Sequence, residues 1–178
     1  MKIKLIFGTD TGNTDYVIET YLLDLLESFE VEVTEVPDVT LEDWEQNNLF
    51  IIGVPTWYDG VLQSDWEDYF DDFKEIDFTG KTVAIFGLGD QIGYGEFFVD
   101  GIGILAKVIL ENGGNVIGHW PREDYDFVES KALMNDELLY GLAIDEDNED
   151  DLTHYRFQQW VDQLKKEIAE LFPNYQEA

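Results

Sequence analysis

Cysteine is absent from the 178 residues of this chain. The protein therefore has no disulfides, no thiol chemistry and no cysteine-ligated zinc or iron–sulfur cluster. Histidine is almost absent too, because only His119 and His154 occur, far apart in the sequence. We expect no metal site and assign both histidines to surface or structural roles.

Positive charge is also scarce. Ten Lys and Arg residues stand against 40 Asp and Glu residues, which gives a net charge of −30. The acids are spread along the chain, as in an acidic globular surface rather than a disordered tail. Such a surface repels nucleic acid and anionic membranes and suits basic protein partners, and it favours a monomer. Solubility in a salty cytoplasm is a second, partial explanation of the acidity.

Long apolar runs are missing as well. No stretch approaches the length of a membrane span, and the apolar residues after Lys4 end at Gly8, too early for a signal peptide. We therefore expect a cytoplasmic protein without membrane insertion. The hydrophobic content of 44% suffices for one core, and we expect residues 1–178 to form a single domain.

Strand-like apolar runs alternate with helical patterns along the chain. The nearly continuous apolar segments 2–7, 49–54 and 82–87 are typical of central parallel strands, 31–36 alternates like an edge strand, and 115–118 is the fifth run. Helical spacing of apolar residues predicts the helices between them, at 17–29, 41–46, 65–74, 104–109 and 152–171. The order predicts an α/β protein with a doubly wound, five-stranded parallel sheet and helices on both faces.

Residues 119–142 interrupt this alternation without a clear period. An irregular segment of this length inside a compact domain indicates a functional loop or an insertion. The last strand is expected to resume at 141–145.

The loop after the first strand, TDTGNT, has the chemistry to hold a phosphate with neutral donors. Threonine hydroxyls, an asparagine amide and the N–H groups at a helix start can surround an anion, and glycine permits the tight turn. The loop matches neither the Walker A nor the G-x-G-x-x-G pattern. A polar turn that caps a helix explains the same letters equally well. The candidate residues are Thr9, Asp10, Thr11, Gly12, Asn13 and Thr14.

Two further loops follow the third and fourth apolar strands, PTWYDG and LGDQIGY. In a doubly wound sheet they emerge beside the first loop, at the carboxyl ends of the strands where ligands bind. Each contributes an aromatic ring, Trp57 and Tyr94, and two rings beside one cleft suggest a flat aromatic ligand stacked between them. The candidate residues are Pro55, Thr56, Trp57, Tyr58, Asp59, Gly60, Leu88, Gly89, Asp90 and Tyr94.

The three loops, in this order and spacing, resemble those of the long-chain flavodoxins of cyanobacteria and algae. The resemblance covers about residues 2–172 and includes W-P, Y-D-F and S-K-A in the segment 119–142, which resembles the family's long insertion in the last strand. It implies the flavodoxin-like strand order 2-1-3-4-5, a topology for which flavodoxin with its FMN is a standard illustration.

The resemblance also implies a cofactor and its contacts. Residues 9–14 would surround the phosphate of FMN, and Trp57 and Tyr94 would sandwich the isoalloxazine. The backbone of residues 58–60 would lie near flavin N5, and Gly89 and Asp90 near the pyrimidine edge. Thr56 and Asp147 would lie near the ribityl chain.

The implied function is that of a low-potential one-electron carrier, not an enzyme, in which non-covalently bound FMN shuttles between semiquinone and hydroquinone. The implied partners are redox proteins with basic surfaces, such as ferredoxin–NADP reductase and photosystem I. The sequence departs from the family at Tyr58–Asp59, where a small or amide residue and an apolar one are common. It departs again at Phe97 and Val99, where polar residues are common near the flavin rim.

Three alternatives share the topology. An FMN-dependent quinone or azo-compound reductase would need a substrate pocket over the flavin. A binding module without FMN would be folded and colourless. A phosphoacceptor regulator is excluded, because the first strand ends in Phe7-Gly8-Thr9 without paired acids and no lysine directly follows 115–118.

Overall fold

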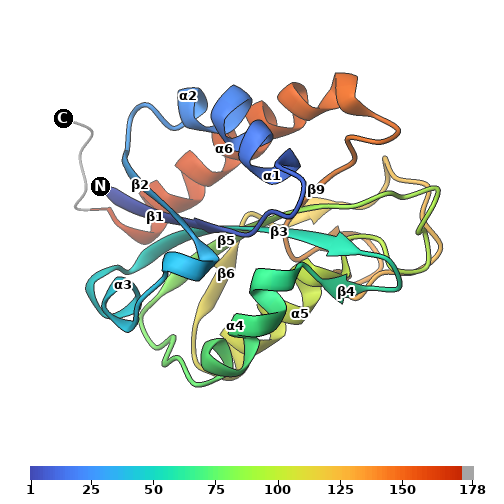
Figure 1. Ribbon diagram of the computed structural model, residues 1–178. Coiled ribbons are helices and arrows are strands. Elements are labelled where there is room, and N and C mark those ends of the chain that lie inside the picture. The colour runs from blue at the N-terminus through green and yellow to red at the C-terminus, as the bar shows by residue number, and fades with distance from the viewer. Residues whose placement is uncertain (174–178) are drawn as a thin grey trace.

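The computed structural model of the protein describes residues 1–173, and its centre is one mostly parallel sheet (Figure 1). The main strand order is β2-β1-β3-β5, and the fifth position is shared by β6 and β9, which both pair with β5. The strands are β1 (Lys2–Phe7), β2 (Glu30–Glu35), β3 (Leu49–Trp57), β5 (Thr82–Leu88), β6 (Asn115–Ile117) and β9 (Leu142–Ile144). The expected 2-1-3-4-5 order is confirmed, with the last strand divided by the insertion.

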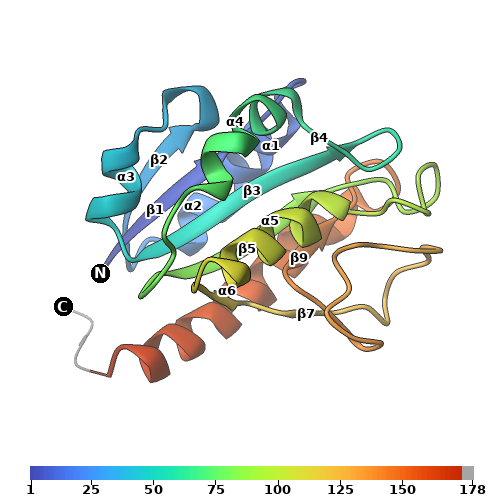
Figure 2. The ribbon, with the colours of Figure 1, turned by 90° about the horizontal axis from the view of Figure 1, so that it is seen from below.

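Helices cover both faces of the sheet, as the alternation of apolar segments predicted (Figures 1 and 2). One face carries α6 (Thr153–Leu171) and a continuous helical segment made of α1 (Asn13–Val17), the π-helical η1 (Ile18–Leu22) and α2 (Leu23–Leu25). The other face carries α3 (Leu41–Gln46), α4 (Ser64–Lys74) and α5 (Asp100–Glu111), and two short 3₁₀ turns are η2 (Val36–Asp38) and η3 (Asp150–Leu152). No helix within residues 1–173 has both the length and the apolar character needed to cross a membrane.

The first helix differs from the expected range 17–29. It begins at Asn13, directly after Gly12, and helical geometry ends near Leu26. The apolar stripe located its buried face, but the polar first turn carries no such periodicity. At the other end Leu26 and Phe29 continue the stripe and pack against the core, although the chain has already left the helix. Helix boundaries are the part of a pattern that periodicity defines least well.

The core consists of two apolar clusters separated by the sheet. Because successive side chains of a strand point to opposite faces, Ile3, Leu5 and Phe7 pack against α6 and η1, while Ile6 packs against the cluster under α4 and α5. The aromatic centre of the second cluster is Trp66, whose indole N–H donates to Gly53 O at 3.1 Å. Burial on both faces fixes the strand register, so the loops at the carboxyl ends of β1, β3 and β5 meet at one edge.

The insertion forms a small satellite beside α5 (Figure 2). It contains an antiparallel pair, β7 (Trp120–Pro121) and β8 (Leu138–Leu139), which the sequence did not predict. Its chain passes so close to α5 that a Cβ at Gly103 would lie 1.9 Å from Lys131 O. Glycine at this position of α5 therefore permits the insertion to dock.

One cation is buried at the edge of the sheet. The side chain of Lys4 is 1% exposed, and its Nζ lies 2.7 Å from Glu32 Oε1 on β2 and 2.6 Å from Asp43 Oδ1 on α3. Burial lowers the pKa of Lys4, but the bonds to the two carboxylates outweigh this and raise it above its usual value. Lys4 thus joins the edge strand and α3 to β1.

Lys4→Met should lower the free energy of unfolding by about 2–3 kcal/mol, because it leaves Asp43 without its cation. Lys2→Met is the matched control, since Lys2 Nζ also contacts Glu32, at 2.5 Å, but its side chain is 41% exposed. Urea unfolding of both variants at pH 7 measures the difference. Net interactions lower the pKa of Asp43, so the stability that it contributes is present at neutral pH and lost as the pH falls through its folded pKa. Equal losses in the two variants would contradict a special role for Lys4.

Candidate functional site

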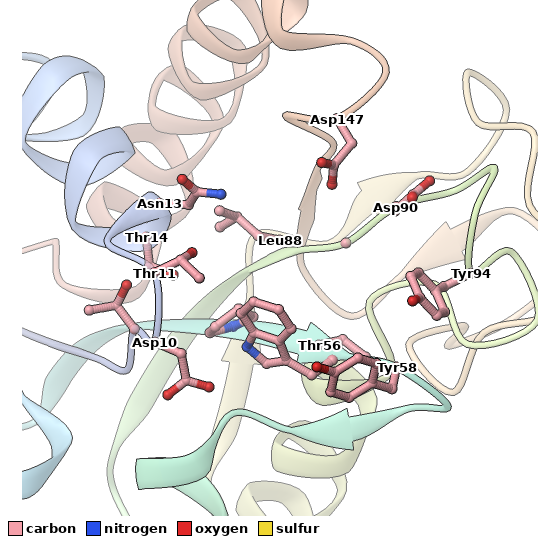
Figure 3. Close-up of a pocket in the computed structure, with 14 residues that line it drawn as sticks. Asp10, Thr11, Asn13, Thr14, Thr56, Tyr58, Leu88, Asp90, Tyr94 and Asp147 are labelled. Carbon is pink, nitrogen blue, oxygen red and sulfur yellow. The ribbon is translucent and has the colours of Figure 1, made fainter.

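A cavity of about 380 Å³ lies at the carboxyl ends of β1, β3, β5 and β9 (Figure 3). Its size is within the range of small-molecule sites. Most of the residues singled out from the sequence line it, namely Thr9, Asp10, Thr11, Asn13, Thr14, Pro55, Thr56, Trp57, Tyr58, Leu88, Gly89, Asp90, Tyr94 and Asp147. Gly12, Asp59 and Gly60 belong to the same loops but do not line the cavity.

One end of the cavity is formed by the loop after β1 and the start of α1. Gly12 has a left-handed φ of 84°, and its N–H donates to Thr9 Oγ1 at 2.9 Å. This turn starts the helix at Asn13, where the first N–H groups of a helix lack partners within it. Thr11, Asn13 and Thr14 face the cavity from this loop (Figure 3). The end is therefore lined by neutral hydrogen-bond donors.

Asp10 is the one acid in this loop that lines the cavity, and its carboxylate is held by α4. Its Oδ1 accepts hydrogen bonds from Ser64 Oγ at 2.5 Å and from Gln63 Nε2 at 2.9 Å. Partial burial raises the pKa of Asp10, but these bonds outweigh it and the pKa lies below its usual value. The charge of Asp10 is thereby engaged by α4, so an acid is tolerated in the loop.

The other end of the cavity is aromatic. The ring of Tyr58 makes an angled contact with each of the rings of Trp57 and Tyr94, with centroid distances of 5.9 Å and 6.4 Å. Tyr58 and Tyr94 are 64% and 43% exposed, so this end opens to solvent. The buried Nε1 of Trp57 has no hydrogen-bond partner within the described part of the chain. A buried N–H without a partner is rare and marks a place for an acceptor.

The turn that carries Tyr58 is strained. Tyr58 has a φ of 42° and Gly60 a φ of 80°, and the turn joins β3 to the short antiparallel strand β4 (Val61–Leu62). The buried Asp100 lies directly behind this turn. A Cβ atom added at Gly60 would be only 2.6 Å from Asp100 Oδ2. Neither β4 nor the left-handed tyrosine was predicted, since a two-residue strand carries no periodic signal and tyrosine rarely adopts positive φ.

The wall opposite the threonine loop carries carboxylates (Figure 3). Partial burial raises the pKa of Asp90, but hydrogen bonds from Gly93 N, Asn148 Nδ2 and Ile92 N outweigh it, so the pKa is lowered. Burial and the nearby charges of Asp90 and Asp145 raise the pKa of Asp147. Among the described residues, no lysine or arginine lines the cavity. Any group bound here meets negative charge at this wall.

The two positions that depart from the family near the flavin rim, Phe97 and Val99, do not line the cavity. Val99 is fully buried, with a φ of 47° directly before α5. Their apolar side chains are explained by packing beneath the loop. Asp145 and Gln91 are buried behind the wall, and the sequence did not predict a role for either of them at the site. No local sequence pattern predicts this role, because it depends on contacts between segments that are distant in the sequence.

The cavity brings together the three loops whose motifs resemble those of flavodoxins. A family profile described as flavodoxin matches residues 5–160. The chain belongs to the flavodoxin family.

Curated flavodoxins are similar over nearly the whole chain. The flavodoxin of Picosynechococcus sp. is 48% identical over 92% of this chain and 96% of its own length. The flavodoxin of Synechocystis sp. is 45% identical over 92% of this chain and 96% of its own length. The flavodoxin of Klebsiella pneumoniae is 41% identical over 93% of this chain and 94% of its own length. The crystal structure of a Fusobacterium nucleatum flavodoxin bound to flavin mononucleotide has a TM-score of 0.87 and 30% identity, covering 93% of this chain and 98% of that one. Sequence and fold thus agree on the flavodoxin family.

Gly12→Ala should lower the free energy of unfolding by about 1 kcal/mol, the cost of a left-handed conformation for an L side chain. Gly80→Ala is a matched control, since Gly80 has a φ of 76° and, like Gly12, no atom within 4 Å of an added Cβ. Urea unfolding should give similar losses for both. Only the change at Gly12 should also weaken ligand binding in the cavity. A much larger loss at Gly12 would mean that this loop contributes to stability beyond its backbone geometry.

Proposed function

We propose that this flavodoxin is a low-potential one-electron carrier that binds FMN non-covalently in the cavity and works between the one- and two-electron-reduced forms of the flavin. The observation that carries the proposal is a single cavity with neutral donors at one end and paired aromatic rings at the other. The FMN-bound relative from Fusobacterium nucleatum supports the choice of cofactor.

The donors of the site fit a phosphate monoester. The hydroxyls of Thr9, Thr11 and Thr14, the amide of Asn13 and the N–H groups at the start of α1 would hold its oxygens. The partnerless indole N–H of Trp57 supplies a further donor. The carboxylate of Asp10 is engaged by Ser64 and Gln63, which limits its repulsion of the phosphate.

The aromatic end fits a flat ring. Trp57 and Tyr94 would stack on its two faces, with residues 58–60 at the N5 edge and Gly89 and Asp90 at the pyrimidine edge. Thr56 and Asp147 would lie along the ribityl chain. Bound FMN supplies a ring that accepts and gives one electron at a time and takes up a proton at N5.

The charge of the protein favours low potentials. A negative charge gained in the cavity would be repelled by each carboxylate about 10 Å away by roughly 0.8 kcal/mol at an effective dielectric of about 40, before salt screening. The wall holds Asp90 and Asp147, the buried Asp145 lies behind it, and residues 5–73 contain 18 acids and no Lys or Arg. Several such repulsions together lower the potential of the second one-electron reduction. A lysine or arginine beside the phosphate would counteract them.

The positive residues lie mostly away from the cavity, which favours an oriented approach of basic partners. Helices that connect parallel strands run back to the opposite edge, where the second halves of α4, α5 and α6 and the starts of β1 and β5 lie. These segments hold seven of the ten cations, namely Lys2, Lys4, Lys74, Lys81, Lys107, Lys165 and Lys166. The cavity end would thus lead in encounters with basic redox proteins. By family resemblance we propose ferredoxin–NADP reductase and photosystem I, with the carrier monomeric in the cytoplasm.

The second candidate is an FMN-dependent quinone or azo-compound reductase of the same fold. A substrate would have to stack on one face of the flavin, and the rings of Trp57 and Tyr94 would cover both faces. This arrangement favours the carrier.

Stepwise anaerobic reduction of the purified holoprotein, followed by visible absorption, tests the proposal. We expect a yellow protein that is reduced in two separate one-electron steps, the second at clearly lower potential. Direct two-electron bleaching together with NADPH oxidation by the protein alone would favour the reductase. A folded, colourless protein that takes up no added FMN would overturn both.

Thr11→Val should weaken FMN binding by about tenfold or more, because the loss of one hydrogen bond to a charged group costs about 1.5–3 kcal/mol. Riboflavin lacks the phosphate, so its affinity should hardly change. Fluorescence titration of the apoprotein with each flavin measures both constants. Equal losses for FMN and riboflavin would mean that Thr11 does not contact the phosphate.

A further inference from the structure

The insertion runs alongside the segment that carries Tyr94. Hydrogen bonds connect the two segments at successive positions, so residues 126–131 follow residues 91–100 in the same direction. The bonds are Asp126 N to Gln91 Oε1, Val128 N and Glu129 N to Gly95 O, Ser130 Oγ to Phe98 O, and Lys131 N to Asp100 Oδ1. The aromatic wall of the cavity is thus supported from behind by the insertion.

Gln91 is the residue at which this support reaches a third segment. Its side chain is 4% exposed and does not line the cavity. Its Oε1 accepts from Asp126 N at 2.7 Å, while its Nε2 donates to Asp145 Oδ2 at 2.9 Å and to Glu149 Oε2 at 2.8 Å. One amide therefore joins the Tyr94 loop, the insertion and the segment between β9 and α6.

Asp145 organises that third segment. Its side chain has no exposed surface, and its carboxylate accepts from the backbone N–H groups of Asp147 and Asn148 and from the Asn148 amide. Asn148 Nδ2 also donates to Asp90 Oδ1 at 2.8 Å. The two cavity walls that carry Asp90 and Asp147 are therefore bonded to the same buried carboxylate.

The wall around Tyr94 is a tight turn held by hydrogen bonds within residues 90–94. Tyr94 N donates to Asp90 O at 3.1 Å, and Asp90 Oδ1 accepts from the N–H groups of Ile92 and Gly93. Gln91 lies inside this turn with its side chain directed away from the cavity and bonded to the segments behind it. The place of the Tyr94 ring therefore depends on what holds Gln91.

We propose that Gln91 is a positioning residue, which sets the width of the flavin slot by fixing the Tyr94 wall to the Asp147 wall through Asp145 and to the insertion through Asp126. The role of the insertion at this site is to hold the aromatic wall. The proposal rests on the proposed function, because the slot is taken to receive the isoalloxazine. It assigns the ring end of the site to long-range contacts, whereas the phosphate end depends on its own loop and α4.

Gln91→Leu tests this with FMN and riboflavin as separate probes. It removes the side-chain amide shared by Asp126 N–H, Asp145 and Glu149, while the bond from the backbone N–H of Gln91 to Asp145 Oδ2, 3.2 Å long, remains. We expect both flavins to bind about tenfold more weakly, with the ratio of their affinities unchanged. Flavin fluorescence at saturation should rise, because quenching depends on stacking with the rings. Gln163→Leu is the matched control, since Gln163 Nε2 donates to His119 O and Glu167 Oε1, tying the other end of the insertion to α6. It should lower the melting temperature without changing flavin affinity or saturated fluorescence.

Asn148→Ala provides a second variant whose exposed side chain is not needed for folding. It removes only the side-chain amide with which Asn148 joins Asp90 to Asp145. It should lower the affinities for FMN and riboflavin by the same factor, and by less than Gln91→Leu does. Wild-type affinity and saturated fluorescence in both variants, with only a lower melting temperature, would overturn the proposal. A loss of affinity for FMN without a loss of affinity for riboflavin would also overturn it. Failure of the wild-type protein to bind any flavin would instead overturn the proposed function.

Discussion

The proposed phosphate site has to work without a cation, because no lysine or arginine among residues 1–173 lines the cavity. Neutral donors can do this if their dipoles are fixed before the anion arrives, since no reorganisation is then needed when it binds. The left-handed Gly12 and the helix that starts at Asn13 provide that geometry, and Ser64 and Gln63 engage the nearest carboxylate. The start of α4 is therefore as much a part of the phosphate end as the threonine loop.

The scarcity of positive charge also affects how the buried charges of the protein are stabilised. Lys4 is held between two carboxylates, and Arg156, 3% exposed, donates to Glu149 at 2.6 Å and lies over the ring of Tyr125 at 4.4 Å. Burying an isolated charge is costly, so each of these cations has a carboxylate partner. The carboxylates of Asp90 and Asp145 are stabilised by hydrogen bonds instead. These hydrogen bonds favour the charged form near the proposed flavin, where a cation would raise its potentials.

Much of the fold was predictable because the sheet is buried on both faces. Continuous apolar runs located β1, β3 and β5, and with the order of elements they predicted that the loops at 9–14, 55–60 and 88–94 meet at one edge. The rest depends on contacts that no local pattern reports. The positive φ of Tyr58 is imposed by the turn between β3 and β4, and Gln91 and Asp145 acquire their roles only when three distant segments meet.

The two ends of the cavity are held by different kinds of contact, and this separation suits a carrier. Bonds within residues 9–14 and to the start of α4 fix the phosphate end, so its geometry is defined by short segments on rigid elements. The ring end depends on Gln91, Asp145 and the insertion, where three segments meet and the side-chain hydrogen bonds of Gln91 span 35 to 58 residues of sequence. If both ends bind parts of one FMN molecule, as proposed, affinity at the phosphate end would hold the ring in its slot at high effective concentration. The rings and acids around the flavin would then be free to set its potentials, since tight binding would not rest on them alone.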